Sequence, residues 1–162
     1  MVRAAAFVCD NMGYGIGIYL MWRVVMSDRE ALVRRFVADV WNGARPESVH
    51  ELVSPECPGA SGPGPEGVLA WHAGRRASFP DLAYEVVDIV AHDDRAALRW
   101  RAAGTQRGQF GPVPATGRRV EYAGATFLRF DAAGRIDDVW SVNELFGVLE
   151  QLGVQFTPPA GD

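Results

Sequence analysis

The chain has 162 residues, of which 48% are hydrophobic and 22% are charged, a balance that indicates one globular domain with a sizeable core. Its formal net charge of −4 disfavours a nucleic-acid partner, and its 16 basic residues are all arginine. Because lysine is absent, Schiff-base chemistry on a lysine and a lysine-dependent phosphate-binding loop are both excluded.

The cysteine and histidine content gives no sign of a metal site. Cys9 and Cys57 are too few for a disulfide framework, and His50, His72 and His92 match no ligand spacing. We therefore expect a reducing, cytoplasmic setting, with neither a metal nor an organic cofactor.

Residues 1–26 differ in character from the rest and are interpreted as a poorly ordered leader. The apolar run at residues 16–22 is shorter than the roughly 18 residues that a membrane helix needs, so no membrane partner is expected. A signal peptide is the alternative, although its small-residue cleavage site is missing where it should fall. The predicted domain covers residues 27–154, and residues 155–162 form a tail.

Two helices and a loop are predicted first. Ser27 begins an S-x-x-E capping box, and apolar residues then recur at helical spacing, which predicts an amphipathic helix over residues 28–41. Pro46 can open a short second helix. Residues 54–65 contain four prolines and three glycines and predict a loop that could shield or gate a pocket.

A third helix is predicted over residues 66–77. It places His72 three and four positions after Leu69 and Val68, on the apolar side of the helix. His72 therefore points toward the core, where it is either a hydrogen-bonded structural residue or a catalytic one.

The second half of the chain alternates with a period of two residues. This pattern predicts strands over residues 82–91, 95–103, 119–130 and 135–142, followed by a helix over residues 144–152. Helices followed by strands indicate an α+β fold, in which helices fill the concave side of a curled antiparallel sheet and leave one end open for a small molecule. The first strand is apolar on both faces, which predicts a homodimer through the outer face of the sheet.

Several short motifs occur in an order typical of one family. They are Phe79-Pro80-Asp81-Leu82, Ala96-Ala97-Leu98-Arg99-Trp100, Gly104-Thr105, Pro114-Ala115-Thr116-Gly117-Arg118, Gly134-Arg135-Ile136, Trp140 and Gln151-Leu152-Gly153. Over residues 28–153 the chain thus resembles the SnoaL-like polyketide cyclases. The resemblance implies a cone-shaped α+β barrel and cofactor-free ring closure on a polyketide-derived intermediate in antibiotic biosynthesis. The wider fold also hosts dehydratases, isomerases and non-enzymes.

Two positions depart from the family pattern. Asn143 stands where the aldol-type members carry a catalytic aspartate, and Gln106 replaces the histidine of Gly-Thr-His. An asparagine can donate and accept hydrogen bonds but cannot exchange a proton at neutral pH. Both departures favour a ring closure that needs shape and hydrogen bonding, such as a cycloaddition.

The candidate catalytic residues are Asn143, Arg129, Asp88, His72 and Glu121, and the candidate substrate-binding residues are Tyr84, Trp100, Phe127, Trp140 and Arg101. Several of them have a simpler explanation. Asn143 could cap the last helix, Arg129 could be a solvated strand residue, and the aromatic residues could form the wall of the pocket without taking part in the reaction. Asp88 or Glu121 would serve as a base only if it were buried in the cone. The alternative functions are a hydrolase, a dehydratase or an isomerase on this fold, and a non-catalytic small-molecule-binding module.

Overall fold

A computed structural model describes residues 29–156 of the chain. The predicted leader at residues 1–26, the capping serine at position 27 and nearly all of the predicted tail therefore lie outside the described residues. Helical residues 29–36 continue into the π-helical turn η1 (Val37–Trp41), followed by η2 (Pro46–Ser48), α2 (Val49–Leu52), α3 (Gly64–Ser78), β1 (Ala83–His92), β2 (Arg95–Thr105), β3 (Arg119–Phe130), β4 (Ile136–Asn143) and α4 (Leu145–Gln151).

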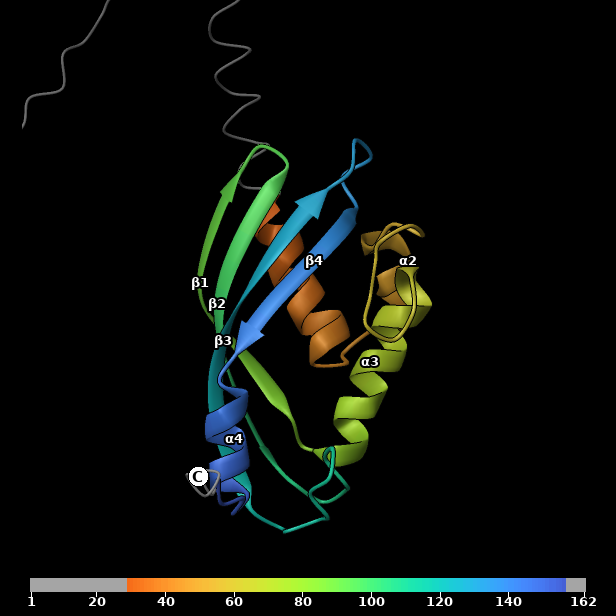
Figure 1. Ribbon diagram of the computed structural model, residues 1–162. Helices are drawn as coiled ribbons and strands as arrows, with labels where there is room; N and C mark the ends of the chain where they lie inside the picture. Colours follow the sequence, from red (N-terminus) through yellow and green to blue (C-terminus); the bar gives the residue numbers. More distant parts are fainter. Residues whose placement is uncertain (1–28, 157–162) are drawn as a thin grey trace, which may run out of the picture.

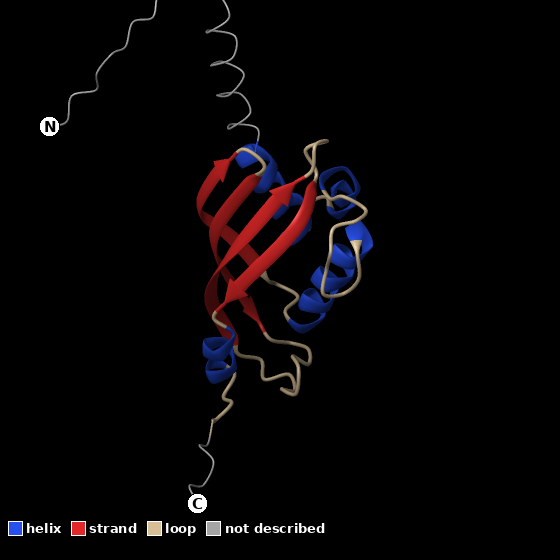
Figure 2. Cartoon of the chain, turned by 45° about the horizontal axis from the view of Figure 1, so that its top comes forward, coloured by secondary structure: helices blue, strands red, loops and turns tan. Residues whose placement is uncertain are grey.

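The four strands form one antiparallel sheet in the order β1-β2-β3-β4. The sheet curls, and the first helix, α2 and α3 lie on its concave side, while α4 lies at one end beside β3 (Figures 1 and 2). This arrangement is the predicted α+β cone. No helix within residues 29–156 combines the length and the apolar character needed to cross a membrane.

Alternating burial along the strands assigns their two faces. On β3, Thr126, Leu128 and Phe130 are at most 3% exposed and face the helices, whereas Phe127 and Arg129 point to the outer face. The core joins these inner residues to the buried side of the first helix, including Phe36 and Val40. Burial of this apolar stripe is what fixes the first helix against the sheet.

A β-bulge changes the parity of β1. The register slips between Val86 and Asp88, so one extra residue is inserted opposite β2. Tyr84 and Val86 face the core before the bulge, and Ile89 faces it after the bulge. Asp88 is thereby turned to the exposed outer face.

Candidate active site

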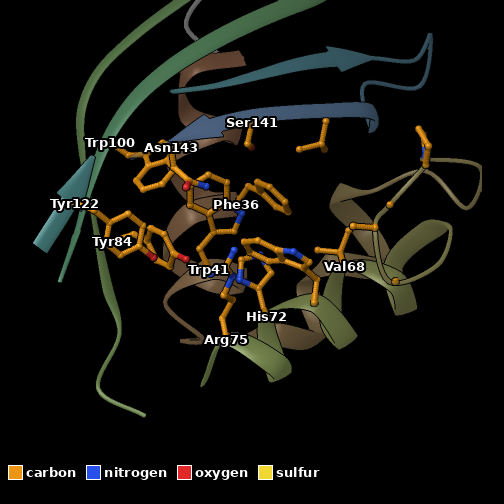
Figure 3. Close-up of a pocket in the computed structure, with 16 residues that line it drawn as sticks. Phe36, Trp41, Val68, His72, Arg75, Tyr84, Trp100, Tyr122, Ser141 and Asn143 are labelled. Carbon is orange, nitrogen blue, oxygen red and sulfur yellow. The ribbon is translucent and has the colours of Figure 1, made fainter. Parts of the chain in front are cut away.

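A cavity of about 270 Å³ lies between the inner face of the sheet, the first helix and α3 (Figure 3). Its lining residues come from all of these elements and from the loop before α3: Phe36, Trp41, Pro58, Gly59, Ala60, Gly67, Val68, Trp71, His72, Arg75, Tyr84, Trp100, Tyr122, Val139, Ser141 and Asn143. The loop predicted to shield a pocket therefore does contribute to the wall of one. The long apolar side chains are suited to a flat or extended apolar ligand.

Trp41 is the centre of an aromatic cluster that forms much of the wall. Its ring centroid lies 5.1 Å from that of Tyr84 and 5.9 Å from those of Trp100 and His72. Most of these pairs meet edge to face, a favoured geometry that holds the rings in place before a ligand arrives.

Gly124 on β3 makes room for the indole ring of Trp100. A Cβ atom at this position would lie 2.3 Å from a ring carbon of Trp100 and 2.5 Å from the carbonyl oxygen of Val142. A side chain at position 124 would therefore collide both with the indole ring, which lines the cavity, and with the backbone of β4, so the glycine is needed for Trp100 to lie where it does.

Among the residues that line the cavity, His72 and Tyr84 have the most strongly shifted pKa values. Burial, with smaller effects of Arg76 and Arg75, lowers the pKa of His72 from 6.5 to about 3. Burial, followed by the neighbouring Tyr122 side chain, raises the pKa of Tyr84 well above its ordinary value. At neutral pH both side chains are therefore uncharged and can only donate or accept hydrogen bonds.

Asn143 is the last residue of β4 and lines the cavity beside Trp100 (Figure 3). The interpretation of Asn143 as a helix cap is wrong, because the residue preceding α4 in the N-cap position is Glu144. Among the described residues that line the cavity there is no aspartate or glutamate, and Arg75 is the one permanently charged side chain. Its guanidinium group stacks on the rings of Trp71 and Phe110 at 4.8 and 5.3 Å.

Four of the ten candidate residues meet at this cavity: His72, Tyr84, Trp100 and Asn143. Asp88, whose facing the sequence left open, and Arg101, a candidate substrate-binding residue, do not line the cavity. Both are exposed on the outer face of the sheet, Asp88 because of the bulge and Arg101 because it alternates with the inward Trp100. Neither is therefore desolvated enough to act as a buried base or polar contact.

The expectation for Phe127 and Trp140 is corrected. These two rings face each other on the outer face at 5.6 Å and are 51% and 58% exposed. Arg129 shares their parity, forms an ion pair with Asp137 at 2.9 Å and lines a separate polar cleft with Ser54. On this part of β3, the side chain that points toward the cone interior is that of Thr126.

Glu121 also lies outside the cavity. Its exposed carboxylate is 3.6 Å from the guanidinium of Arg119, and its backbone pairs with the side chain of Gln151 on α4 at 2.9 Å in both directions. The residue therefore anchors α4 to β3 through its main chain.

Gln106 is completely buried but is not among the residues that line the cavity. Its side-chain amide donates to the carbonyl oxygens of Val113 and Pro114 at 3.2 and 3.1 Å, and its oxygen accepts bonds from the backbone and hydroxyl of Thr116 at 3.1 and 2.6 Å. Gln106 thus holds the loop between β2 and β3 in its conformation. No group of three His, Cys, Asp or Glu side chains within residues 29–156 is arranged to bind a metal.

Sequence reasoning missed several lining residues, among them Trp41, Tyr122 and Ser141. Ser141 was identifiable from parity, because it lies two residues before Asn143 on the same strand face. Trp41 was recognised only as part of an apolar helix stripe, since helical spacing cannot separate a cavity wall from a solid core.

A model of the SnoaL-like polyketide cyclase family matches residues 31–152. IdmH, a candidate polyketide cyclase from Streptomyces antibioticus, is 31% identical, with a TM-score of 0.65 over 78% of this chain and 99% of that one. AclR, a candidate hydroxylase from Streptomyces galilaeus, is 31% identical, with a TM-score of 0.67 over 79% of this chain and 97% of that one.

A candidate SnoaL-like polyketide cyclase from Jannaschia sp. CCS1 shares the fold at 20% identity, with a TM-score of 0.72 over 80% of this chain and 94% of that one. A search of curated proteins finds no match. Since the family model covers most of the chain, the protein belongs to the SnoaL-like polyketide cyclase family and has its α+β cone fold.

Proposed function

We propose that the protein is a cofactor-free cyclase that closes a ring on a polyketide-derived intermediate of antibiotic biosynthesis, by cycloaddition rather than by aldol chemistry. One observation carries this proposal: among the described residues no aspartate or glutamate lines the cavity, and Asn143 stands where the aldol-type members carry a catalytic aspartate. The one histidine in this described lining, His72, has a pKa that burial lowers to about 3. A group with that pKa is a poor general base or acid near pH 7.

The cavity would instead catalyse by holding the two reacting ends of one molecule together. The aromatic wall around Trp41, Tyr84 and Trp100 would bind an extended apolar chain and fold it into a reactive conformation. Such positioning supplies on the order of 7–11 kcal/mol of a barrier at best. Asn143 would orient a polar group of the substrate by hydrogen bonding.

The test uses a linear probe in which a conjugated diene is tethered to an α,β-unsaturated ketone. The tether also carries an ester and a β-hydroxyl group, so that all three reactions are open to the probe. A cycloaddition consumes the diene absorbance and leaves the mass unchanged, whereas hydrolysis of the ester adds one water and loss of the hydroxyl group removes one. We expect faster loss of the diene with the protein than without it, at constant mass. A gain or loss of water would favour the hydrolase or dehydratase, and binding without turnover would favour the non-catalytic module.

We also propose that the partner across the outer face of the sheet is a second copy of the chain. Phe127 and Trp140 pair on that face, next to the half-exposed Val142. Contiguous exposed apolar surface of this kind marks an interaction site. A two-fold dimer would bury the same patch on both copies.

A further inference from the structure

A chain of three hydrogen-bonding side chains links two residues of the cavity wall, Trp100 and Ser141, through Thr126, which does not line the cavity. The indole Nε1 of Trp100 donates to the Oγ1 atom of Thr126 at 3.0 Å, and Thr126 Oγ1 lies 2.7 Å from the Oγ atom of Ser141. Trp100 and Thr126 are buried, whereas Ser141 is exposed at the cavity on the edge strand β4. The chain therefore runs from the core toward the place where a ligand would lie, and Figure 3 shows its two end residues, Trp100 and Ser141, at the cavity.

The direction of these bonds follows from the donors and acceptors that are present. An indole N–H can only donate, so Thr126 Oγ1 is the acceptor of the first bond. Thr126 is 0% exposed, and Ser141 is the only acceptor that its hydroxyl hydrogen meets among the described residues. A buried hydroxyl that did not donate would leave its hydrogen unsatisfied, which is costly.

The hydroxyl hydrogen of Thr126 therefore goes to Ser141, and the hydrogen of Ser141 is left for a partner in the cavity. Each bond in such a chain polarises the next, so the terminal hydroxyl becomes a better donor. Asn143, two residues further along the same strand face, provides a second polar side chain about 7 Å away. Both groups lie where a substrate oxygen could be bound.

We propose that Ser141 is a substrate-binding residue that donates a hydrogen bond to a carbonyl oxygen of the substrate, and that Thr126 positions it. This inference rests on the proposed function and narrows it: the substrate is an enone or a related conjugated carbonyl compound, not a pure hydrocarbon polyene. A donor aimed at this oxygen stabilises the negative charge that develops there as the conjugated double bond reacts. Such charge stabilisation complements the positioning by the aromatic wall.

The test measures binding of two neutral ligands that differ in one group. trans-Chalcone carries a carbonyl, and trans-1,3-diphenylpropene has a methylene in its place. Their dissociation constants are measured from the indole N–H resonances of 15N-labelled full-length protein, because Trp41, Trp71 and Trp100 line the cavity. We expect wild type to prefer the ketone by about three- to tenfold, the range of one net hydrogen bond.

Ser141→Ala should abolish this preference by weakening ketone binding alone, and it should fold because residue 141 is exposed on an edge strand. Thr126→Val keeps the shape of Thr126 but breaks the chain, so it should reduce the preference, and Thr126→Ser should restore it. A role confined to holding β3 against β4 would change both affinities equally.

An unchanged preference in Ser141→Ala would overturn the proposal for Ser141, and an unchanged preference in Thr126→Val would overturn the positioning role. In both cases ligand binding in the cavity would stand, and the proposed function would be decided separately by turnover of the tethered diene–enone. If wild type binds neither ligand, or binds both equally, this inference fails, whereas the proposed function fails only if the tethered diene–enone is not turned over.

Discussion

The side-chain amide of Asn42 pairs with the backbone of Tyr84 in the same way that a neighbouring strand would. Its nitrogen donates to the carbonyl oxygen of Tyr84 at 2.9 Å, and its oxygen accepts from the Tyr84 N–H at 2.8 Å. The end of the first helix is thereby tied to the start of β1, next to the cavity. This pair fixes the distance between Trp41 and Tyr84, whose rings form one corner of the cavity wall.

Asn42→Ala should destabilise the protein by about 1–3 kcal/mol, because both polar groups of the Tyr84 backbone lose their partner in a part-buried site. Urea unfolding gives the change in free energy. Arg34→Gln is the matched control on the same helix, since it removes only an exposed ion pair with Glu30 and should cost less than about 1 kcal/mol. Equal effects of the two substitutions would count against the proposed tie.

The buried His72 should make stability fall as the solution becomes mildly acidic. Its pKa is lowered from 6.5 to about 3 in the folded protein, so between these values the unfolded chain binds a proton that the folded chain rejects. Its contribution is complete above pH 6.5 and is lost on acidification, by up to about 1.4 kcal/mol per pH unit. Urea midpoints of wild type and His72→Gln should diverge from pH 8 to 4.5, and parallel curves would contradict the assignment.

Gln106 should matter for stability and not for ligand binding. Gln106→Ala leaves the carbonyl oxygens of Val113 and Pro114 without their donor, at an expected cost of about 2–4 kcal/mol. Gln109→Ala is the control, because it removes one exposed bond to Gly111 in the same loop. The chalcone affinity of Gln106→Ala should match wild type under folding conditions. A selective loss of affinity would instead connect the loop to the cavity.

The outer face of the sheet should hold two copies together. Light scattering at micromolar concentration should give twice the chain mass of 17.7 kDa. Trp140→Glu should yield the monomer mass, because it places a charge in the apolar patch with Phe127. Phe146→Glu is a matched control at a similarly exposed aromatic residue on α4 and should remain dimeric. A monomeric wild type would refute the dimer.

The architecture could be predicted from periodicity, but the facing of strand residues could not. The predicted third strand, residues 119–130, matches β3, and helix capping and turn residues placed most other boundaries within two residues. A period of two gives two faces without saying which is buried. Phe127 and Trp140 were expected inside because they are aromatic, yet the smaller Thr126 and Ser141 hold the inner positions.

The cavity itself depends on contacts between distant parts of the chain. The ring centroids of Trp41 and Trp100 lie 5.9 Å apart although the two residues belong to different elements. Gly124 has no side chain, which leaves room for the indole ring of Trp100. The bulge that turns Asp88 outward leaves no clear signal in a segment that is apolar on both faces. Motif resemblance, by contrast, pointed to Asn143, which lines the cavity, and its role in the reaction stays a prediction.

The central claim is that ring closure in this cavity needs no proton transfer by a side chain. Single-turnover cyclisation of the tethered diene–enone by wild type, Asn143→Asp and Asn143→Ala between about pH 6 and 8 tests it directly. The wild-type rate should be nearly flat, because His72 stays neutral throughout that range. Asn143→Ala should be slower by one lost hydrogen bond, about 1–3 kcal/mol if its partner stays unpaired, and Asn143→Asp should bring no gain. A bell-shaped wild-type profile together with a faster Asn143→Asp would contradict the claim and point to acid–base catalysis.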